Sequence, residues 1–197
     1  REWRKSVYRQ IGILASADQA AGVEAMLEEF PYIDRERVGV WGWSGGGSMT
    51  LNLLFRHPKI YSMGVAVAPV PDQKLYDTIY PERYMGLPDD NADGYSDGSP
   101  ITHASGLKGD LLLIHGTGDD NVHYQGSELL INELIEHGKQ FDMMAYPNRS
   151  HSISEGDGTS LHLRRTMTRY LEEHLELGPK PIAPTKQAEA TTFLGEP

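Results

Sequence analysis

The sequence predicts an α/β fold in which a mostly parallel sheet carries helices on both faces. Short apolar segments alternate along the chain with longer segments of helical spacing. The short segments are apolar almost throughout, which is typical of parallel strands that are buried on both faces. The strands expected on this basis are residues 37–41, 63–70, 110–116 and 141–147. They make a thin sheet for such a fold, so we expect that further strands precede residue 1.

Four segments have the apolar spacing of helices. The first lies within residues 17–34, where Asp18 is the expected N-cap and Pro31 the expected stop. The apolar stripe expected on this helix consists of Ala21, Met26, Leu27 and Phe30. The later helices are expected within residues 48–58, 125–138 and 158–178.

Two segments depart from this alternation. Residues 71–109 are polar and aromatic, rich in Asp, Tyr, Pro and Gly, and a long insertion of this kind is usually functional or lid-like. Residues 178–197 have the composition of a linker. We therefore expect one partial α/β domain over residues 1–177 and a flexible tail over residues 178–197.

The composition excludes several classes of function. The 197 residues carry a net charge of −10 with no cluster of Lys and Arg, which argues against nucleic acid as a partner. The chain has no cysteine, so disulfides, thiolate metal sites and Cys nucleophiles are excluded. No apolar run reaches the roughly 20 residues of a membrane-spanning helix.

The segment "GWSGG", residues 42–46, has the G-x-S-x-G pattern of a nucleophile elbow. An expected strand precedes it and an expected helix follows it, which is the context that the motif requires. The two glycines, Gly42 and Gly46, would let strand and helix pack closely, so that the Ser44 hydroxyl projects above the sheet. The N–H of Gly45 could then donate to an oxyanion. A phosphate-binding turn would need a different glycine pattern, which is not present.

A serine nucleophile needs a base and an orienting acid, and loops after later strands supply both. Asp119 and Asp120 follow the strand at 110–116, and His151 follows the strand at 141–147. The order Ser, Asp, His is that of the α/β-hydrolase fold. The spacing does not separate Asp119 from Asp120. Other histidines have expected structural roles. His115 is expected to be buried, and His123 to make a contact near the start of a helix. Others lie on or beside expected helices, namely His57, His137, His162 and His174.

The insertion contributes aromatic and acidic side chains. Tyr76 and Tyr80 would share one face if the segment is helical, where they could wall an apolar pocket or simply pack on the sheet. The acidic residues lack the spacing of an EF-hand, so we expect no metal site. They are Asp72, Asp77, Asp89, Asp90, Asp93 and Asp97.

Several long segments resemble the C-terminal catalytic domain of the prolyl oligopeptidase family of serine peptidases, and the dipeptidyl peptidase IV branch most of all. These segments are "VGVWGWSGGG", "GVAVAPV", "YDTIYPERYMGLP", "LLLIHGTGDDNVHYQ" and "SHSI", and the resemblance covers about residues 1–177. It implies an α/β-hydrolase fold in which Ser44 is the nucleophile, Asp119 the orienting acid and His151 the base. It also implies one oxyanion donor at Gly45, and Asn121 near the substrate carbonyl. The residues implied around a proline-accepting pocket are Val70, Tyr76, Tyr80 and Val122.

The sequence departs from the family pattern at three places. Gly45 stands where this branch usually has Tyr, and Gln73 stands where an aromatic residue is usual. Both differences predict a wider pocket and a looser preference for proline. The chain also begins after the family's first strands, its second oxyanion donor and its β-propeller. The expected strand at 37–41 would then expose an apolar edge, which predicts association with a second copy or with the missing N-terminal part.

The resulting hypothesis is a serine peptidase that cleaves peptides after proline or a small residue, through an acyl-enzyme and without a cofactor. One alternative is a carboxylesterase of the same fold, favoured by the open pocket at Gly45. Another is a catalytically weak fragment that serves as a binding or assembly module. The resemblance favours a periplasmic or extracellular location, and the residues themselves leave the compartment undecided.

Overall fold

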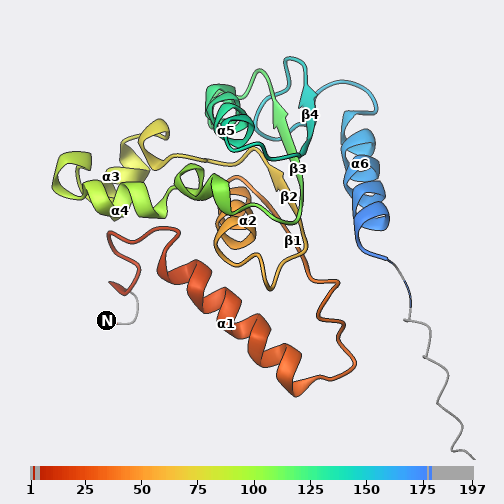
Figure 1. Cartoon of the computed structure of the whole chain (residues 1–197). Helices are drawn as coiled ribbons and strands as arrows, with labels where there is room; N and C mark the ends of the chain where they lie inside the picture. Colours follow the sequence, from red (N-terminus) through yellow and green to blue (C-terminus); the bar gives the residue numbers. More distant parts are fainter. Residues whose placement is uncertain (1, 3–4, 177, 179–197) are drawn as a thin grey trace, which may run out of the picture.

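The structure is a computed structural model, and it describes residues 2, 5–176 and 178. A parallel sheet with strand order β1-β2-β3-β4 forms its centre (Figure 1). Its strands are β1 (Gly39–Trp43), β2 (Met63–Val67), β3 (Asp110–Gly116) and β4 (Asp142–Tyr146). The predicted α/β fold is confirmed, and β3 has the predicted ends. Apart from Gly178, the tail predicted over residues 178–197 lies outside the described residues.

Helices cover both faces of the sheet, as predicted, but unequally. The longest helices are α1 (Leu14–Glu29), α2 (Gly45–Arg56), α5 (Tyr124–Glu136) and α6 (Thr159–His174). In Figure 1 the helices α1, α2 and α5 lie to one side of the sheet and α6 lies to the other. The described residues contain no helix that is both long and apolar enough to cross a membrane.

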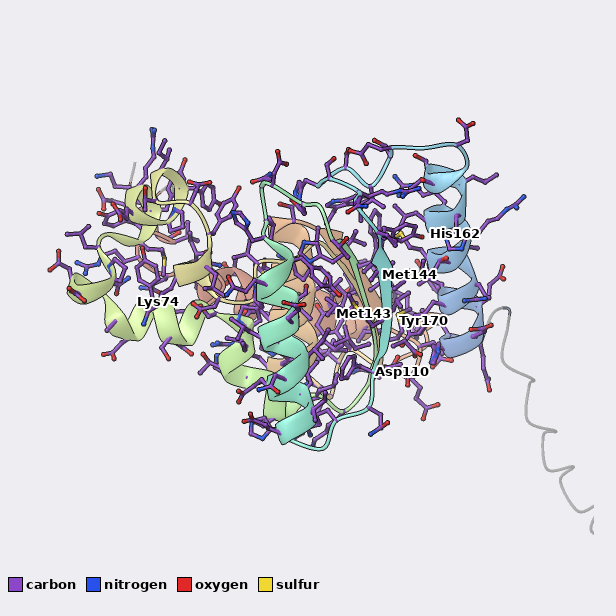
Figure 2. The ribbon with its side chains drawn as sticks, turned by 90° about the horizontal axis from the view of Figure 1, so that it is seen from above. Lys74, Asp110, Met143, Met144, His162 and Tyr170 are labelled. Carbon is purple, nitrogen blue, oxygen red and sulfur yellow. The ribbon has the colours of Figure 1, made fainter. Side chains whose placement is uncertain are left out.

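Alternate side chains of the central strands enter two separate cores. Leu111 and Leu113 of β3 pack with the core that α2 and α5 complete, whereas Leu112 and Ile114 pack with the core beneath α6. Figure 2 shows Tyr170 of α6 in this second core, in the layer between β4 and the helix. This double burial explains why the strands read as nearly continuous apolar runs.

The first helix differs from the prediction because its start depends on packing. α1 begins at Leu14, so Asp18 lies inside it, and its N-cap position is Ile13 with no capping side chain. Gly12 turns the chain there with a φ of +84°, and a Cβ at this position would lie 2.4 Å from the Gly98 carbonyl oxygen. Of the predicted stripe only Leu27 is buried, since Ala21, Met26 and Phe30 are exposed; the other buried residues of the helix are Ser16 and Ala20.

Strand β1 lies at the edge of the sheet, because within the described residues it pairs only with β2. Trp41 at its middle is 54% exposed. An open apolar edge of this kind is a template for further pairing. The apolar edge expected from the sequence is therefore present, and the association expected through it stays a prediction.

Residues 71–109 fold into short helices that lie beside α2. They are η2 (Gln73–Leu75), α3 (Ile79–Met85), η3 (Pro88–Asp90), α4 (Ala92–Gly98) and η4 (Pro100–Gly106). Asn52 of α2 donates from Nδ2 to the Gly98 carbonyl over 3.2 Å, and Arg56 pairs with Asp97 over 3.0 Å. The insertion is thus tied to the sheet layer through α2.

Candidate active site

Ser44 lies in a strained turn between β1 and α2. Its φ of +58° and ψ of −122° fall in a region that residues with a side chain rarely adopt. Its N–H donates to the Val67 carbonyl over 2.8 Å, which ties the turn to the end of β2. Ser44 occupies the N-cap position of α2, yet its side chain makes no capping bond. The hydroxyl is therefore free for chemistry.

The glycines around Ser44 have different roles. A Cβ on Gly42 would lie 2.2 Å from the Gly46 carbonyl oxygen, so the close approach of strand and helix requires glycine at 42. A Cβ on Gly46 would meet nothing within 4 Å. The sequence predicted that both positions need glycine, and the structure supports this only for position 42. Gly45 is the first residue of α2, and the N–H at that position has no acceptor within the helix. Its amide is available to an oxyanion.

Asp119 is buried, and its two carboxylate oxygens face different partners. Oδ1 accepts from the backbone N–H of Asn121 over 3.0 Å and of Val122 over 2.9 Å. Oδ2 accepts from Nδ1 of His151 over 2.7 Å. Asp120, which spacing alone could not separate from Asp119, is exposed. Asp119 is thus the carboxylate that faces His151.

His151 lies in the loop after β4, and the elbow holds that loop in place. Nε1–H of Trp43, the residue before Ser44, donates to the His151 carbonyl over 2.9 Å. Ile153, two residues further on, is buried with a φ of +44°, which is unusual for a β-branched residue. Across the described part of the chain, no hydrogen bond joins Ser44 Oγ to His151. Such bonds are often long in an unliganded site and shorten only with substrate bound.

His115 contacts the same carboxylate oxygen, which sequence reasoning did not anticipate. Its Nε2 lies 3.1 Å from Asp119 Oδ2 and 2.9 Å from the Val122 carbonyl. Both neighbours accept hydrogen bonds, so Nε2 carries the hydrogen. Burial lowers the pKa of His115, which favours the neutral ring, and Nδ1 then accepts from the Ser127 hydroxyl over 2.7 Å. His115 therefore holds Asp119 from the side opposite the backbone amides.

Replacing His115 tests this positioning role. We expect His115→Phe to lower kcat about tenfold, because the carboxylate loses one charge-assisted hydrogen bond. His115→Gln retains an N–H donor and should recover part of the loss. KM should stay unchanged, since His115 does not line the pocket beside Ser44. Steady-state kinetics on an ester substrate give both constants, and a folded His115→Phe protein with the parent kcat would contradict the role.

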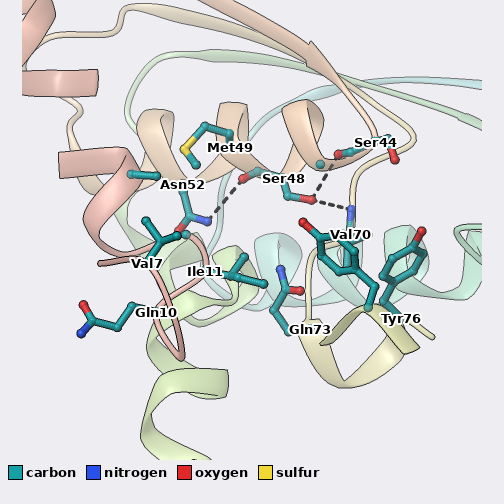
Figure 3. Close-up of a pocket in the computed structure, with 14 residues that line it drawn as sticks. Val7, Gln10, Ile11, Ser44, Ser48, Met49, Asn52, Val70, Gln73 and Tyr76 are labelled. Atoms are coloured by element: carbon teal, nitrogen blue, oxygen red, sulfur yellow. Dashed lines mark hydrogen bonds between the residues drawn. The ribbon is translucent and has the colours of Figure 1, made fainter. Parts of the chain in front are cut away.

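A cavity of about 360 Å³ lies beside Ser44 (Figure 3). Of the residues expected around the pocket, Val70, Tyr76 and Tyr80 line it, together with Ser44 and Gly45. Val122 is not among the lining residues; it is buried in the Asp119 loop. The N-terminal segment also lines the cavity, which the sequence did not indicate. Its lining residues are Val7, Gln10, Ile11, Gly12 and Ala15.

The two tyrosines meet, but not on one helix. Tyr76 follows η2 and Tyr80 lies in α3, and their ring centroids are 5.8 Å apart in an edge-to-face arrangement. The Tyr76 hydroxyl donates to Oδ1 of Asn121 over 2.9 Å. Burial raises the pKa of Tyr76, so the hydroxyl keeps its proton at neutral pH. Asn121 thus links the Asp119 loop to the pocket wall.

The chain is similar to members of one family along most of its length. The sequence profile described as "Prolyl oligopeptidase family" matches residues 1–178. Prolyl endopeptidase FAP of Mus musculus is 38% identical over 175 residues, which is 87% of this chain and 23% of that protein. Venom dipeptidyl peptidase 4 of Vespula vulgaris is 38% identical over 176 residues, 87% of this chain and 22% of that protein.

The likeness extends to three dimensions. The crystal structure of Porphyromonas gingivalis dipeptidyl peptidase 4 superposes with a TM-score of 0.85 at 42% sequence identity. The match covers 89% of this chain and 25% of that one. The chain therefore spans about a quarter, or less, of the length of these relatives.

Proposed function

This chain belongs to the prolyl oligopeptidase family, and we propose that it carries the acyl-transfer centre of a serine peptidase that cleaves after proline or a small residue. The observation that carries the proposal is the bond from His151 Nδ1 to the buried Asp119 carboxylate, 2.7 Å long. A carboxylate at that nitrogen fixes the tautomer in which Nε2 can accept a proton. Relatives named prolyl endopeptidase and dipeptidyl peptidase support peptides as the substrate class.

The reaction follows from these roles. Ser44 Oγ attacks the substrate carbonyl carbon while His151 Nε2 takes the hydroxyl proton. Asp119 stabilises the imidazolium, and the N–H of Gly45 stabilises the oxyanion at the start of α2. Collapse of the tetrahedral intermediate breaks the scissile C–N bond, and His151 gives its proton to the leaving amine. Water then hydrolyses the acyl-enzyme by the same steps.

Within the described residues, no charged side chain lines the cavity beside Ser44, which favours a carboxylesterase as the second candidate. An ester needs no charged group to hold a peptide terminus. The two activities separate when matched anilide and ester substrates carry the same acyl group. A peptidase turns over the anilide at a measurable fraction of the ester rate, whereas an esterase turns over only the ester, because an alkoxide or phenoxide leaves more readily than an amide nitrogen.

Covalent labelling with a fluorophosphonate tests the proposal directly. We expect one adduct on the parent chain and none on Ser44→Ala, because only a serine activated by His151 reacts at an appreciable rate. Intact-mass spectrometry counts the adducts. Ser105→Ala, which removes an exposed hydroxyl in η4, is the matched control and should label like the parent.

Two results would contradict the proposal. A folded parent that takes no label would favour the binding or assembly role, with the elbow formed but not activated. A label that persists in Ser44→Ala would place the nucleophile elsewhere.

A further inference from the structure

We propose that the cavity beside Ser44 selects substrates with an uncharged, hydrogen-bonding side chain longer than proline at the cleaved residue, and that glutamine fits it best. The inference rests on the acyl-transfer centre of the proposed function, and it changes the preferred cleaved residue from proline or a small residue to glutamine. It concerns the side chain of the residue whose carbonyl Ser44 would attack.

The first argument is the charge of the cavity. Its lining is largely aliphatic and aromatic. Among the described residues, no lining side chain carries a formal charge. Placing an ionised carboxylate or ammonium there would remove the charge from water without a counter-charge, which is costly. The cavity therefore disfavours Glu, Asp, Lys and Arg at the cleaved residue.

The second argument is the side-chain amide of Gln73, which faces the cavity and has no hydrogen-bond partner within the described residues. Gln73 is only 4% exposed as a residue. Its backbone N–H donates to Ser99 Oγ over 2.9 Å, whereas no described residue makes a hydrogen bond with its side-chain amide. Figure 3 shows the end of the Gln73 side chain pointing into the cavity. A bound side chain that leaves this amide unpaired removes it from water without replacing its hydrogen bonds, so it binds less well than a side chain that pairs with it.

The third argument is that the other buried amide of the lining is not available to a ligand. Asn52, which is 1% exposed, uses Nδ2 to donate to the carbonyls of Ser48 and Gly98. Its Oδ1 has no hydrogen-bond partner within the described residues, but the atom is buried and closed off from the cavity. The amide of Gln73 is therefore the buried amide that a substrate side chain can reach, and a primary amide can pair with both its oxygen and its nitrogen.

The fourth argument is length. A Cβ on Gly45 would meet nothing within 4 Å, and Gly45 lines the cavity, so open space continues past the nucleophile. The two methylene groups of a glutamine can lie against Val70 and Tyr76 while its amide reaches Gln73. A proline ring would leave that amide unpaired.

The experiment compares acyl substrates that differ only at the cleaved residue, namely Gln, Met, Glu, Pro and Ala, each with a coumarin amide as the leaving group. It uses the polypeptide at its natural length, with active sites counted by fluorophosphonate labelling. We expect kcat/KM for Gln to exceed that for Met about tenfold, because Met matches the length of Gln without its amide. Glu, which adds a charge, should be the poorest of the long side chains.

Three variants locate the effect. Gln73→Met removes the amide at constant length and should abolish the preference for Gln over Met. Gly45→Tyr fills the open space and should lower kcat/KM for Gln more than for Pro or Ala. Gly22→Ala adds a methyl group on α1, outside the cavity lining and with nothing within 4 Å, so it should leave every ratio unchanged.

The outcomes separate this inference from the function on which it rests. A folded protein that takes no label overturns the proposed function, and the inference with it. A labelled protein that cleaves Met and Gln equally well overturns the inference alone. The same holds if Gln73→Met keeps the parent ratio.

Discussion

Asp119→Asn is expected to lower kcat about 10⁴-fold while the protein stays folded. The two backbone N–H groups at Oδ1 decide how the new amide is oriented, because they require an oxygen there. The amide nitrogen must then occupy the Oδ2 position, where it points a donor at His151 Nδ1. His151 must then carry its hydrogen on Nε2, and in that tautomer it could not act as the proposed base for Ser44.

The measurement is kcat on an ester substrate, together with the rate of fluorophosphonate labelling. Asp120→Asn is the matched control, since it makes the same change on the exposed neighbour and should keep the parent rate. If kcat falls less than about tenfold in Asp119→Asn, the assignment of Asp119 as the orienting acid is contradicted, because the wrong His151 tautomer would lower kcat far more. A large loss in both variants would show that the loop, and not the bond to His151, is being disturbed.

Gly42→Ala is expected to destabilise the fold by about 3 kcal/mol and to abolish labelling of Ser44. The added methyl carbon would lie 2.2 Å from the Gly46 carbonyl oxygen and 2.3 Å from its carbon, which are backbone atoms that no side-chain rotation can move. α2 must shift away from β1 to relieve the clash. Ser44 lies between these two elements, so the nucleophile moves with them.

Thermal unfolding and labelling give the two readouts. A loss of about 3 kcal/mol corresponds to a fall in Tm of roughly 6–12 °C for a domain of this size. Gly46→Ala is the control, because the methyl group it adds has open space around it. If Gly42→Ala melts and labels like the parent, then strand and helix are not in close contact at the elbow.

Much of the candidate site could be predicted because its parts are local or follow the order of the chain. The elbow is one contiguous strand, turn and helix, so its pattern is complete within residues 39–56. The carboxyl ends of parallel strands meet at one edge of the sheet. The segments after β1, β3 and β4 were therefore expected to lie together, and the bond between Asp119 and His151 spans two of them.

Contacts between distant segments were beyond this kind of reasoning. His115 could be predicted as buried, but not as a partner of Asp119, since the loop after β3 has to fold back on its own strand to bring them together. The bond from Trp43 to the His151 carbonyl joins residues 108 positions apart. No local pattern in the sequence marks either contact.

The sequence by itself determined the α/β class, the identity of the strands and the position of the elbow, because apolar periodicity and glycine sterics act over a few residues. Only the tertiary structure decided where α1 begins, that His115 contacts Asp119, and that the N-terminal segment lines the cavity. Each of these depends on the direction of a side chain in a loop or on the packing of the N-terminal segment over α2. Such directions are set by contacts made after the chain has folded.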